Sequence, residues 1–166
     1  MGALTREQLD RFAEEGYLVV KNLLDPKAVL EPVIEEYSRV LDQLAEQLYD
    51  GGEISSRYEE LPFGQRYIRI CSESGKVHSQ YFDFSLPFQN VADDTPFWAG
   101  PAVFRALTAP ALLDAVEALI GPEIYSNPVQ HVRVKPPERT LPKNQHGAPI
   151  LGPTPWHQDN GVVTED

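Results

Sequence analysis

The sequence predicts an α+β fold in which helices come first and strands follow. One observation is the long segment after Asp25, where apolar residues recur at the three- and four-residue steps of an amphipathic helix. The other is that most of the 15 prolines lie after residue 86, and proline is disfavoured inside helices. We therefore expect a single domain at 1–166, with a mainly helical part at 1–122 and a strand-rich part at 123–166.

The chain opens with a predicted short helix. Thr5 is expected to cap its start, with Gln8 completing a capping box, and Gly16 is expected to end it. The apolar run at 17–20 then predicts a short buried strand.

The clearest predicted helix follows. Asp25 is a good N-cap and Pro26 a good first helical residue, while Gly51 and Gly52 should end the helix. Its apolar residues define one stripe that we expect to be buried: Leu30, Val33, Ile34, Tyr37, Val40, Leu41, Leu44 and Leu48.

The remaining predicted elements are bounded by glycine, proline or aspartate. They are a strand at 67–70, a helix start at 93–96 leading into Phe97 and Trp98, a helix at 110–120, and strands at 123–125 and 130–134. We expect Pro136 and Pro137 to end the last strand and a long loop to follow it.

Charge and cysteine content exclude several classes of protein. The 14 Lys and Arg against 25 Asp and Glu give a net charge of −11, so we expect neither nucleic acid nor a membrane as a partner. No apolar run approaches the roughly 18 residues of a transmembrane helix, and the acidic N-terminus does not resemble a signal peptide. The single cysteine, Cys71, excludes an intrachain disulfide and favours a cytoplasmic location. No motif predicts the oligomeric state.

The segment 155–161, Pro-Trp-His-Gln-Asp-Asn-Gly, carries the strongest chemical signal. Side chains at i and i+2 of a strand point to the same face, so His157 and Asp159 can converge on one metal ion. Pro155 favours the extended conformation that this requires. Imidazole and carboxylate suit Fe(II), and one more histidine would complete a 2-His-1-carboxylate triad. The same residues also fit a polar pair at a strand end, or an Asx turn at Asp159.

Three matches, taken in order, give the chain a resemblance to the phytanoyl-CoA dioxygenase family of Fe(II)/2-oxoglutarate oxygenases. The first is the opening, LTREQLDRFAEEGYLVVKNLLDP. The second is the helix-Gly-Pro segment at 112–122 with the strand at 129–135 and its proline pair, and the third is PWHQDNG. The resemblance covers nearly the whole chain.

The resemblance implies a double-stranded β-helix (jelly-roll, cupin-like) core in which His157 and Asp159 are two iron ligands. It also implies Fe(II), 2-oxoglutarate as co-substrate, O2, and a small organic or acyl substrate that is hydroxylated. In the family the third ligand is a histidine far downstream of this motif, followed by an arginine that binds 2-oxoglutarate. His78, His131 and His146 all lie upstream. We therefore expect a truncated front portion of the fold, inactive by itself.

Other residues near the motif have secondary roles in this interpretation. Lys135 lies in a basic stretch, 131–143, and is the expected contact for the anionic co-substrate, although such charges also protect a solvated strand edge. Trp156 and Gln158 are candidates for substrate contact, with packing as the alternative. His131 and His146 are expected to be structural.

A second interpretation belongs to another functional class. The chain could be a non-catalytic remnant or binding module of the same fold that pairs with another polypeptide, because open strand edges invite such pairing.

Overall fold

The computed structural model describes residues 4–85, 98, 100–126, 131–141, 143, 145–147 and 156. This part of the chain is rich in helix and contains a two-stranded antiparallel sheet. The elements in order are α1 (Arg6–Glu15), η1 (Pro26–Leu30), α2 (Glu31–Asp50), α3 (Phe63–Ser74), α4 (Ser79–Phe82), β1 (Asp83–Ser85), α5 (Pro101–Leu107), α6 (Pro110–Ile120), β2 (His131–Arg133) and η2 (Glu138–Thr140).

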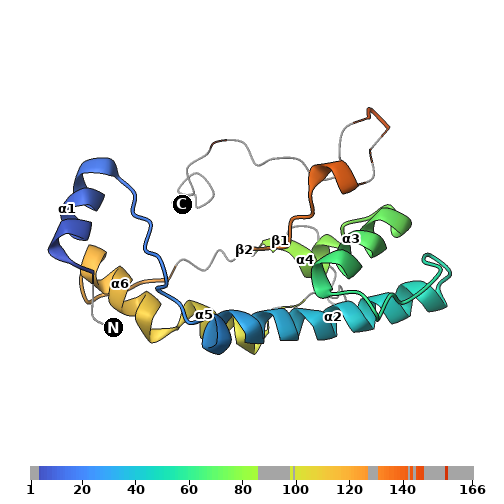
Figure 1. Ribbon diagram of the computed structural model, residues 1–166, viewed down its shortest axis with the longest axis horizontal. Coiled ribbons are helices and arrows are strands. Elements are labelled where there is room, and N and C mark those ends of the chain that lie inside the picture. Colours follow the sequence, from blue (N-terminus) through green and yellow to red (C-terminus); the bar gives the residue numbers. More distant parts are fainter. Residues whose placement is uncertain are drawn as a thin grey trace, which may run out of the picture.

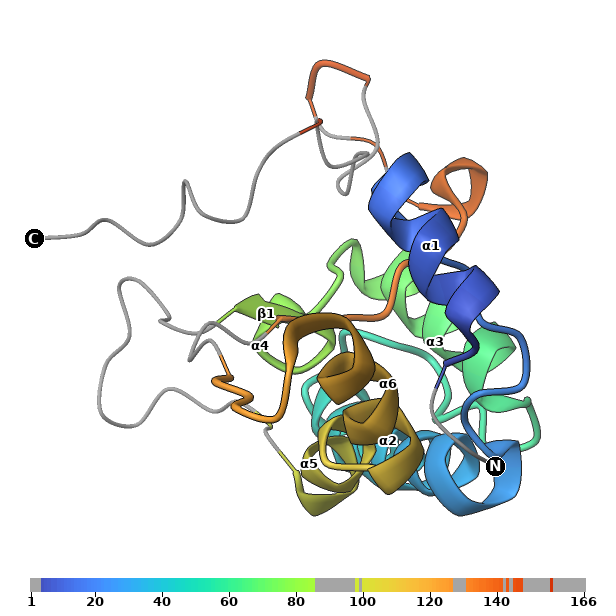
Figure 2. The same ribbon diagram turned by 90° about the vertical axis from the view of Figure 1, so that its left-hand side faces the viewer.

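Helix α2 is the long base of the molecule, and the other elements lie along it (Figure 1). Helix α3 lies over its C-terminal half, α4 and the small sheet lie toward its middle, and α5 packs beside its N-terminal part. Helices α1 and α6 lie beyond that end of α2, and Figure 2 shows the same arrangement from the side.

The predicted start and end of α1 are confirmed. Thr5 Oγ1 accepts a hydrogen bond from the Gln8 N–H at 3.2 Å, and the Thr5 N–H donates to Gln8 Oε1 at 2.8 Å. Gly16 adopts the left-handed conformation with φ 77° and its N–H donates to the Phe12 carbonyl. Glycine suits this position because it has no side chain to oppose a positive φ.

The predicted caps of the long helix are confirmed as well. Asp25 Oδ1 accepts from the N–H groups of Lys27 and Ala28 at 2.8 and 3.3 Å. The first turn, η1, has π-helical bonding before α2 begins. Pro32 lies at this junction and has no N–H to donate to a regular α-helical bond.

The apolar stripe of α2 is buried from Tyr37 onward but not at its start. Leu30 and Ile34 are 43% and 51% exposed, whereas Val33 is partly buried and packs against the core. There α2 meets α3, α4 and the segment after β2, and the main buried side chains are Tyr37, Val40, Leu41, Leu44, Leu48, Tyr67, Ile70, Cys71, Phe82 and Leu141.

Phe82 lies at the centre of this core. Its ring centroid is 4.6 Å from that of Tyr67, 5.8 Å from that of Tyr37 and 6.4 Å from that of Phe63, all within the range of favourable aromatic contact. Phe82 is the last residue of α4 and directly precedes β1. The core therefore fixes the position of the sheet.

Glu36 joins α2 to the start of α5. Its side chain is buried, and its carboxylate accepts hydrogen bonds from Trp98 Nε1 at 3.2 Å and from the Ala102 N–H at 2.9 Å. Gly100 passes so close to this carboxylate that a Cβ there would overlap Glu36 Oε1 and Trp98 Nε1. The absence of a side chain at residue 100 is thus part of the α2–α5 contact.

Three predicted strands were wrong. Residues 67–70 belong to α3. Tyr67, Ile70 and Cys71 stand at helical spacing, and all three are buried in the core that α3 forms with α2. Residues 17–20 form no strand, and Tyr17 and Val19 are exposed. Residues 123–125 likewise form no strand and are exposed.

The helix at 110–120 is confirmed as α6, and the strand at 130–134 is confirmed as β2 over residues 131–133. Gly121 follows α6 and donates its N–H to the Glu117 carbonyl, as expected for the helix end. The predicted helix start at 93–96 and Gln130 lie outside the described residues. Strand β1, at 83–85, falls within the part expected to be mainly helical.

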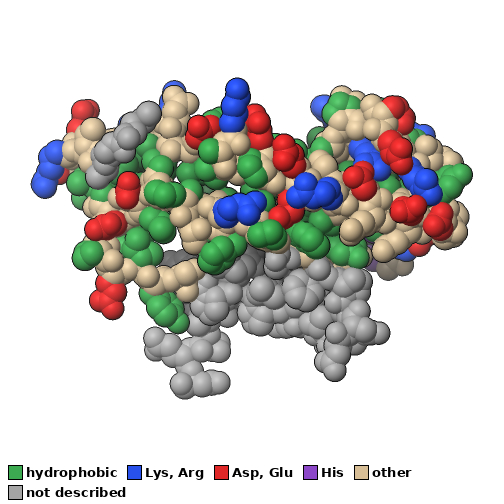
Figure 3. All heavy atoms as spheres, turned by 90° about the horizontal axis from the view of Figure 1, so that it is seen from below, with side chains coloured by type: hydrophobic (Ala, Val, Ile, Leu, Met, Phe, Trp, Pro, Cys, Tyr) green, Lys and Arg blue, Asp and Glu red, His purple; other side chains and the backbone are tan. Residues whose placement is uncertain are grey.

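Charged side chains of both signs are interspersed with apolar ones on the face formed largely by α2 and α5 (Figure 3). Among the helices that the structure describes, none is both long and apolar enough to cross a membrane.

Candidate functional site

The predicted metal motif lies almost wholly outside the described residues. His157, Gln158 and Asp159 are not among them, so the convergence of the imidazole and the carboxylate stays a prediction. Trp156 is described, and its side chain is fully exposed.

The strand that precedes the motif is well defined by its partners. In the β1–β2 ladder, Asp83 lies opposite Arg133, and Arg133 Nε donates to Asp83 Oδ1 at 2.7 Å. The Val134 N–H extends the pairing by donating to the Phe82 carbonyl at 2.7 Å. Asp83 thereby offsets part of the positive charge that the sequence places in this stretch.

Side chains alternate along this strand and its continuation. Val132 and Val134 are half-buried and pack against the core, whereas Arg133 and Lys135 are exposed. Lys135, the expected contact for an anionic co-substrate, therefore lies on the solvent side just beyond β2.

The other histidines do not assemble a metal site in the described structure. His131 belongs to β2, and His146 is exposed with its Nε2 3.3 Å from Gln145 Nε2. Within the described ranges, no group of three or more His, Cys, Asp or Glu side chains is placed to hold a metal ion. His157 and Asp159 stay the residues that the sequence predicts for a metal centre of the expected kind.

Cys71 is buried in the core beside Tyr67. Burial raises the pKa of its thiol to about 11, so the thiolate is scarce near neutral pH. Cys71 is therefore a core residue with little nucleophilic character near neutral pH.

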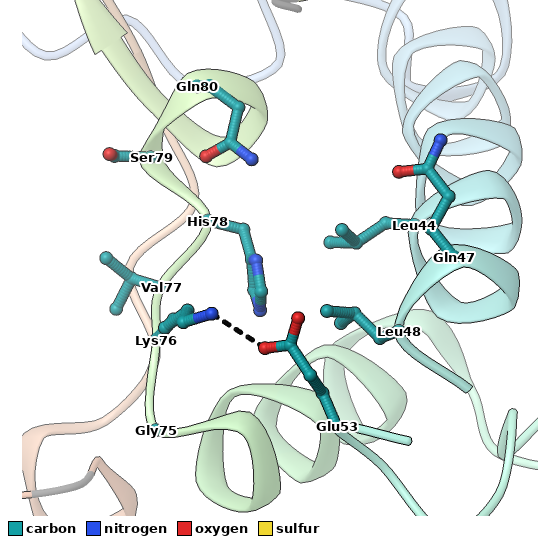
Figure 4. A pocket seen from close by; sticks show the side chains of 10 residues that line it. All are labelled: Leu44, Gln47, Leu48, Glu53, Gly75, Lys76, Val77, His78, Ser79 and Gln80. Carbon is teal, nitrogen blue, oxygen red and sulfur yellow. Dashed lines mark hydrogen bonds and ion pairs between the residues drawn. The ribbon is translucent and has the colours of Figure 1, made fainter. Parts of the chain in front are cut away.

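A polar pocket that the sequence did not reveal opens between α2 and the segment 75–80. Its volume is about 520 Å³, and it is lined by Leu44, Gln47, Leu48, Glu53, Gly75, Lys76, Val77, His78, Ser79 and Gln80 (Figure 4). Lys76 Nζ and Glu53 Oε2 form an ion pair at 2.6 Å along one side of the pocket.

His78 is the unusual residue of this pocket. It is 6% exposed and has a positive φ of 50°, a conformation that is uncommon outside glycine. Ser74 Oγ lies 2.8 Å from the Ile70 carbonyl and 2.9 Å from His78 Nε2; with its proton donated to the carbonyl, it accepts from His78 Nε2. In this arrangement Nε2 carries the hydrogen and Nδ1 carries the lone pair.

The charge state of His78 follows from its surroundings. Burial, and secondarily the charge of Lys76, lower the pKa of His78 to about 4. The imidazole is thus neutral near pH 7. No sequence motif marks this residue, because its burial depends on the packing of α2 against residues 75–80.

No protein-family model, curated protein or solved structure matches the chain.

Proposed function

We propose that the chain is the front portion of an Fe(II)- and 2-oxoglutarate-dependent oxygenase that acts on a small organic or acyl substrate. The observation that carries the proposal is the segment 155–161, in which His157 and Asp159 stand at the spacing that places two side chains on one face of a strand.

The described structure supports this proposal only in its coarse features. A capped helix, α1, and an Asp-Pro helix start precede a helix-rich part, as the resemblance implies. A paired strand, β2, then lies upstream of the motif. A jelly-roll core belongs to the proposal and is not part of the described fold.

Each predicted site residue would have a role that follows from its chemistry. A neutral imidazole at His157 and a carboxylate at Asp159 would hold Fe(II), and the carboxylate would offset one of its two positive charges. Bound Fe(II), with 2-oxoglutarate as co-substrate, would supply the oxidising chemistry with O2. Lys135 would attract the dicarboxylate, while Trp156 and Gln158 would contact the substrate.

Optical titration tests the proposal. The chain is mixed anaerobically with Fe(II), 2-oxoglutarate and free imidazole, which stands in for the third ligand. We expect a visible charge-transfer band that requires both Fe(II) and 2-oxoglutarate and that is lost in His157→Ala. His146→Ala is the matched control and should keep the band. A band that is absent, or that survives in His157→Ala, contradicts the proposal.

A non-catalytic binding module is the second candidate, and exposed apolar side chains favour it. Tyr17, Val19, Phe104 and Ile120 are 57%, 72%, 67% and 63% exposed, and side chains of this kind could pack against a partner. The reading frame beyond codon 166 discriminates between the two candidates. A downstream histidine followed by an arginine favours the oxygenase, and a stop codon favours the binding module.

A further inference from the structure

The pocket at His78 plays no part in the proposed oxygenase chemistry, yet it has the features of a small-molecule site. It is concave, it holds about 520 Å³, and polar groups from two separate segments converge on it. Figure 4 shows the His78 ring and the Glu53 carboxylate pointing into the space in front of α2.

The charges in this pocket are already balanced. Glu53 and Lys76 neutralise each other at 2.6 Å, and His78 is uncharged near pH 7. A free anion would meet the Glu53 carboxylate, and a free cation would meet the Lys76 ammonium. A zwitterion would have to separate an ion pair that is already formed, so the electrostatics favour a ligand without charge.

Hydrogen-bonding capacity is left over on several side chains. His78 Nδ1 presents a lone pair, and the described residues provide no hydrogen bond to it. Glu53 uses one of its two carboxylate oxygens for Lys76. The carboxamides of Gln47 and Gln80 add a donor and an acceptor each. A hydroxyl group can satisfy either kind of partner, because it both donates and accepts.

One wall of the pocket is apolar. Leu44 and Leu48 of α2 line it opposite His78, and both are otherwise almost fully buried in the core (Figure 4). This wall would cover the C–H surface of a ligand while the polar side chains bind its hydroxyl groups.

We propose that the pocket between α2 and residues 75–80 binds a neutral polyhydroxylated small molecule, such as a cyclic polyol or a monosaccharide. His78 Nδ1 and Glu53 Oε1 accept from ligand hydroxyls, Gln47 and Gln80 donate and accept, and Leu44 and Leu48 pack on the carbon skeleton.

NMR titration of the 166-residue chain tests the proposal. The probes are myo-inositol, D-glucose, D-galactose and D-mannose, with glycine, acetate and methylammonium as charged comparisons. At least one polyol should shift the His78 imidazole resonance and the amides of residues 76–80 saturably, with a Kd on the order of 1–10 mM. No saturable shift with any polyol, or saturation only by a charged probe, overturns the proposal.

Variants locate the binding. Gln80→Ala and Gln47→Ala should each weaken the affinity by about fivefold to tenfold, as expected for a lost hydrogen bond. Gln43→Ala is the matched control, because Gln43 is an exposed glutamine of α2 that does not line the pocket. Its affinity should stay within about twofold of the parent, and an equal loss in Gln43→Ala overturns the assignment. Circular dichroism of each variant separates lost binding from lost folding.

Discussion

Replacing Gly100 with alanine would place a methyl group inside the contact that joins α5 to α2. The new Cβ would overlap Glu36 Oε1 and Trp98 Nε1 and would lie 2.5 Å from Glu36 Cδ. The backbone at Gly100 has φ −92° and ψ 168°, which alanine adopts without strain. The expected effect is therefore a steric one on the Glu36 carboxylate.

The magnitude follows from the two hydrogen bonds that Glu36 accepts, from Trp98 Nε1 and the Ala102 N–H. Hydrogen bonds to a charged group contribute about 1.5–3 kcal/mol each, so displacing the carboxylate costs about 3–6 kcal/mol. Alanine also reduces the conformational entropy of the unfolded chain, which stabilises the folded state by about 0.4–1 kcal/mol. Gly100→Ala should thus lower the free energy of unfolding by about 2–5 kcal/mol.

Urea denaturation followed by circular dichroism measures this loss, and a double-mutant cycle assigns it. In a Glu36→Ala background the obstructing carboxylate is gone and only Trp98 Nε1 still crowds the new Cβ, so Gly100→Ala should cost clearly less than in the parent chain. Gly64→Ala is the matched control, because nothing lies within 4 Å of a Cβ at Gly64 in α3. If Gly100→Ala has the same effect with and without Glu36, the steric reasoning is refuted.

Three further predictions concern other parts of the described structure. Thr5→Ala should lower the free energy of unfolding by about 1 kcal/mol, because it removes the capping box of α1. A loss of less than about one third of that value in chemical denaturation would contradict the role of the cap. Cys71 should react with a thiol reagent only on unfolding, since it is buried and its thiol pKa is about 11; rapid labelling of the native chain would contradict this. The pKa of His78 is about 4 in the folded state, below the ordinary value of 6.5, so the unfolded state binds more protons in this interval. The free energy of unfolding should therefore rise between pH 4 and 6.5, by up to about 3 kcal/mol. His78→Gln should flatten that rise in denaturation curves measured across this pH range. An unchanged pH profile in the variant would show that His78 is not the titrating group.

The parts of the fold that the sequence predicted well are those with local signals. The capping box at Thr5 and the glycine at Gly16 define α1 without any tertiary contact, and Asp25 does the same for the start of the long helix. These residues act on backbone groups only a few positions away, so their effect can be read from spacing alone.

The errors arose where tertiary contacts decide the structure. Helix α3 begins after Pro62 with no side-chain cap, and its Tyr67–Ile70 stretch is rich in residues that favour strands. Packing against α2 overrides that preference. The run at 17–20 is rich in residues that favour strands, but strand formation also needs a partner, and none pairs with it among the described residues.

The two candidate sites also differ in whether sequence spacing alone can predict them. His157 and Asp159 are two positions apart in the sequence, so a strand conformation alone would bring their side chains to one face. The pocket at His78 joins residues of α2 to residues about 30 positions later, and no spacing rule connects Leu44 with His78. Only the folded arrangement shows that pocket.

Paramagnetic NMR tests the central claim most directly, because it detects a bound ion even when affinity is weak. The four histidine imidazole resonances are followed while Mn(II), standing in for Fe(II), is added to the chain. The account predicts that the His157 signal broadens first and that Asp159→Ala removes this selectivity. Equal broadening of all four signals, or first broadening of His78, His131 or His146, would contradict the assignment of His157 and Asp159 as partners on one metal ion.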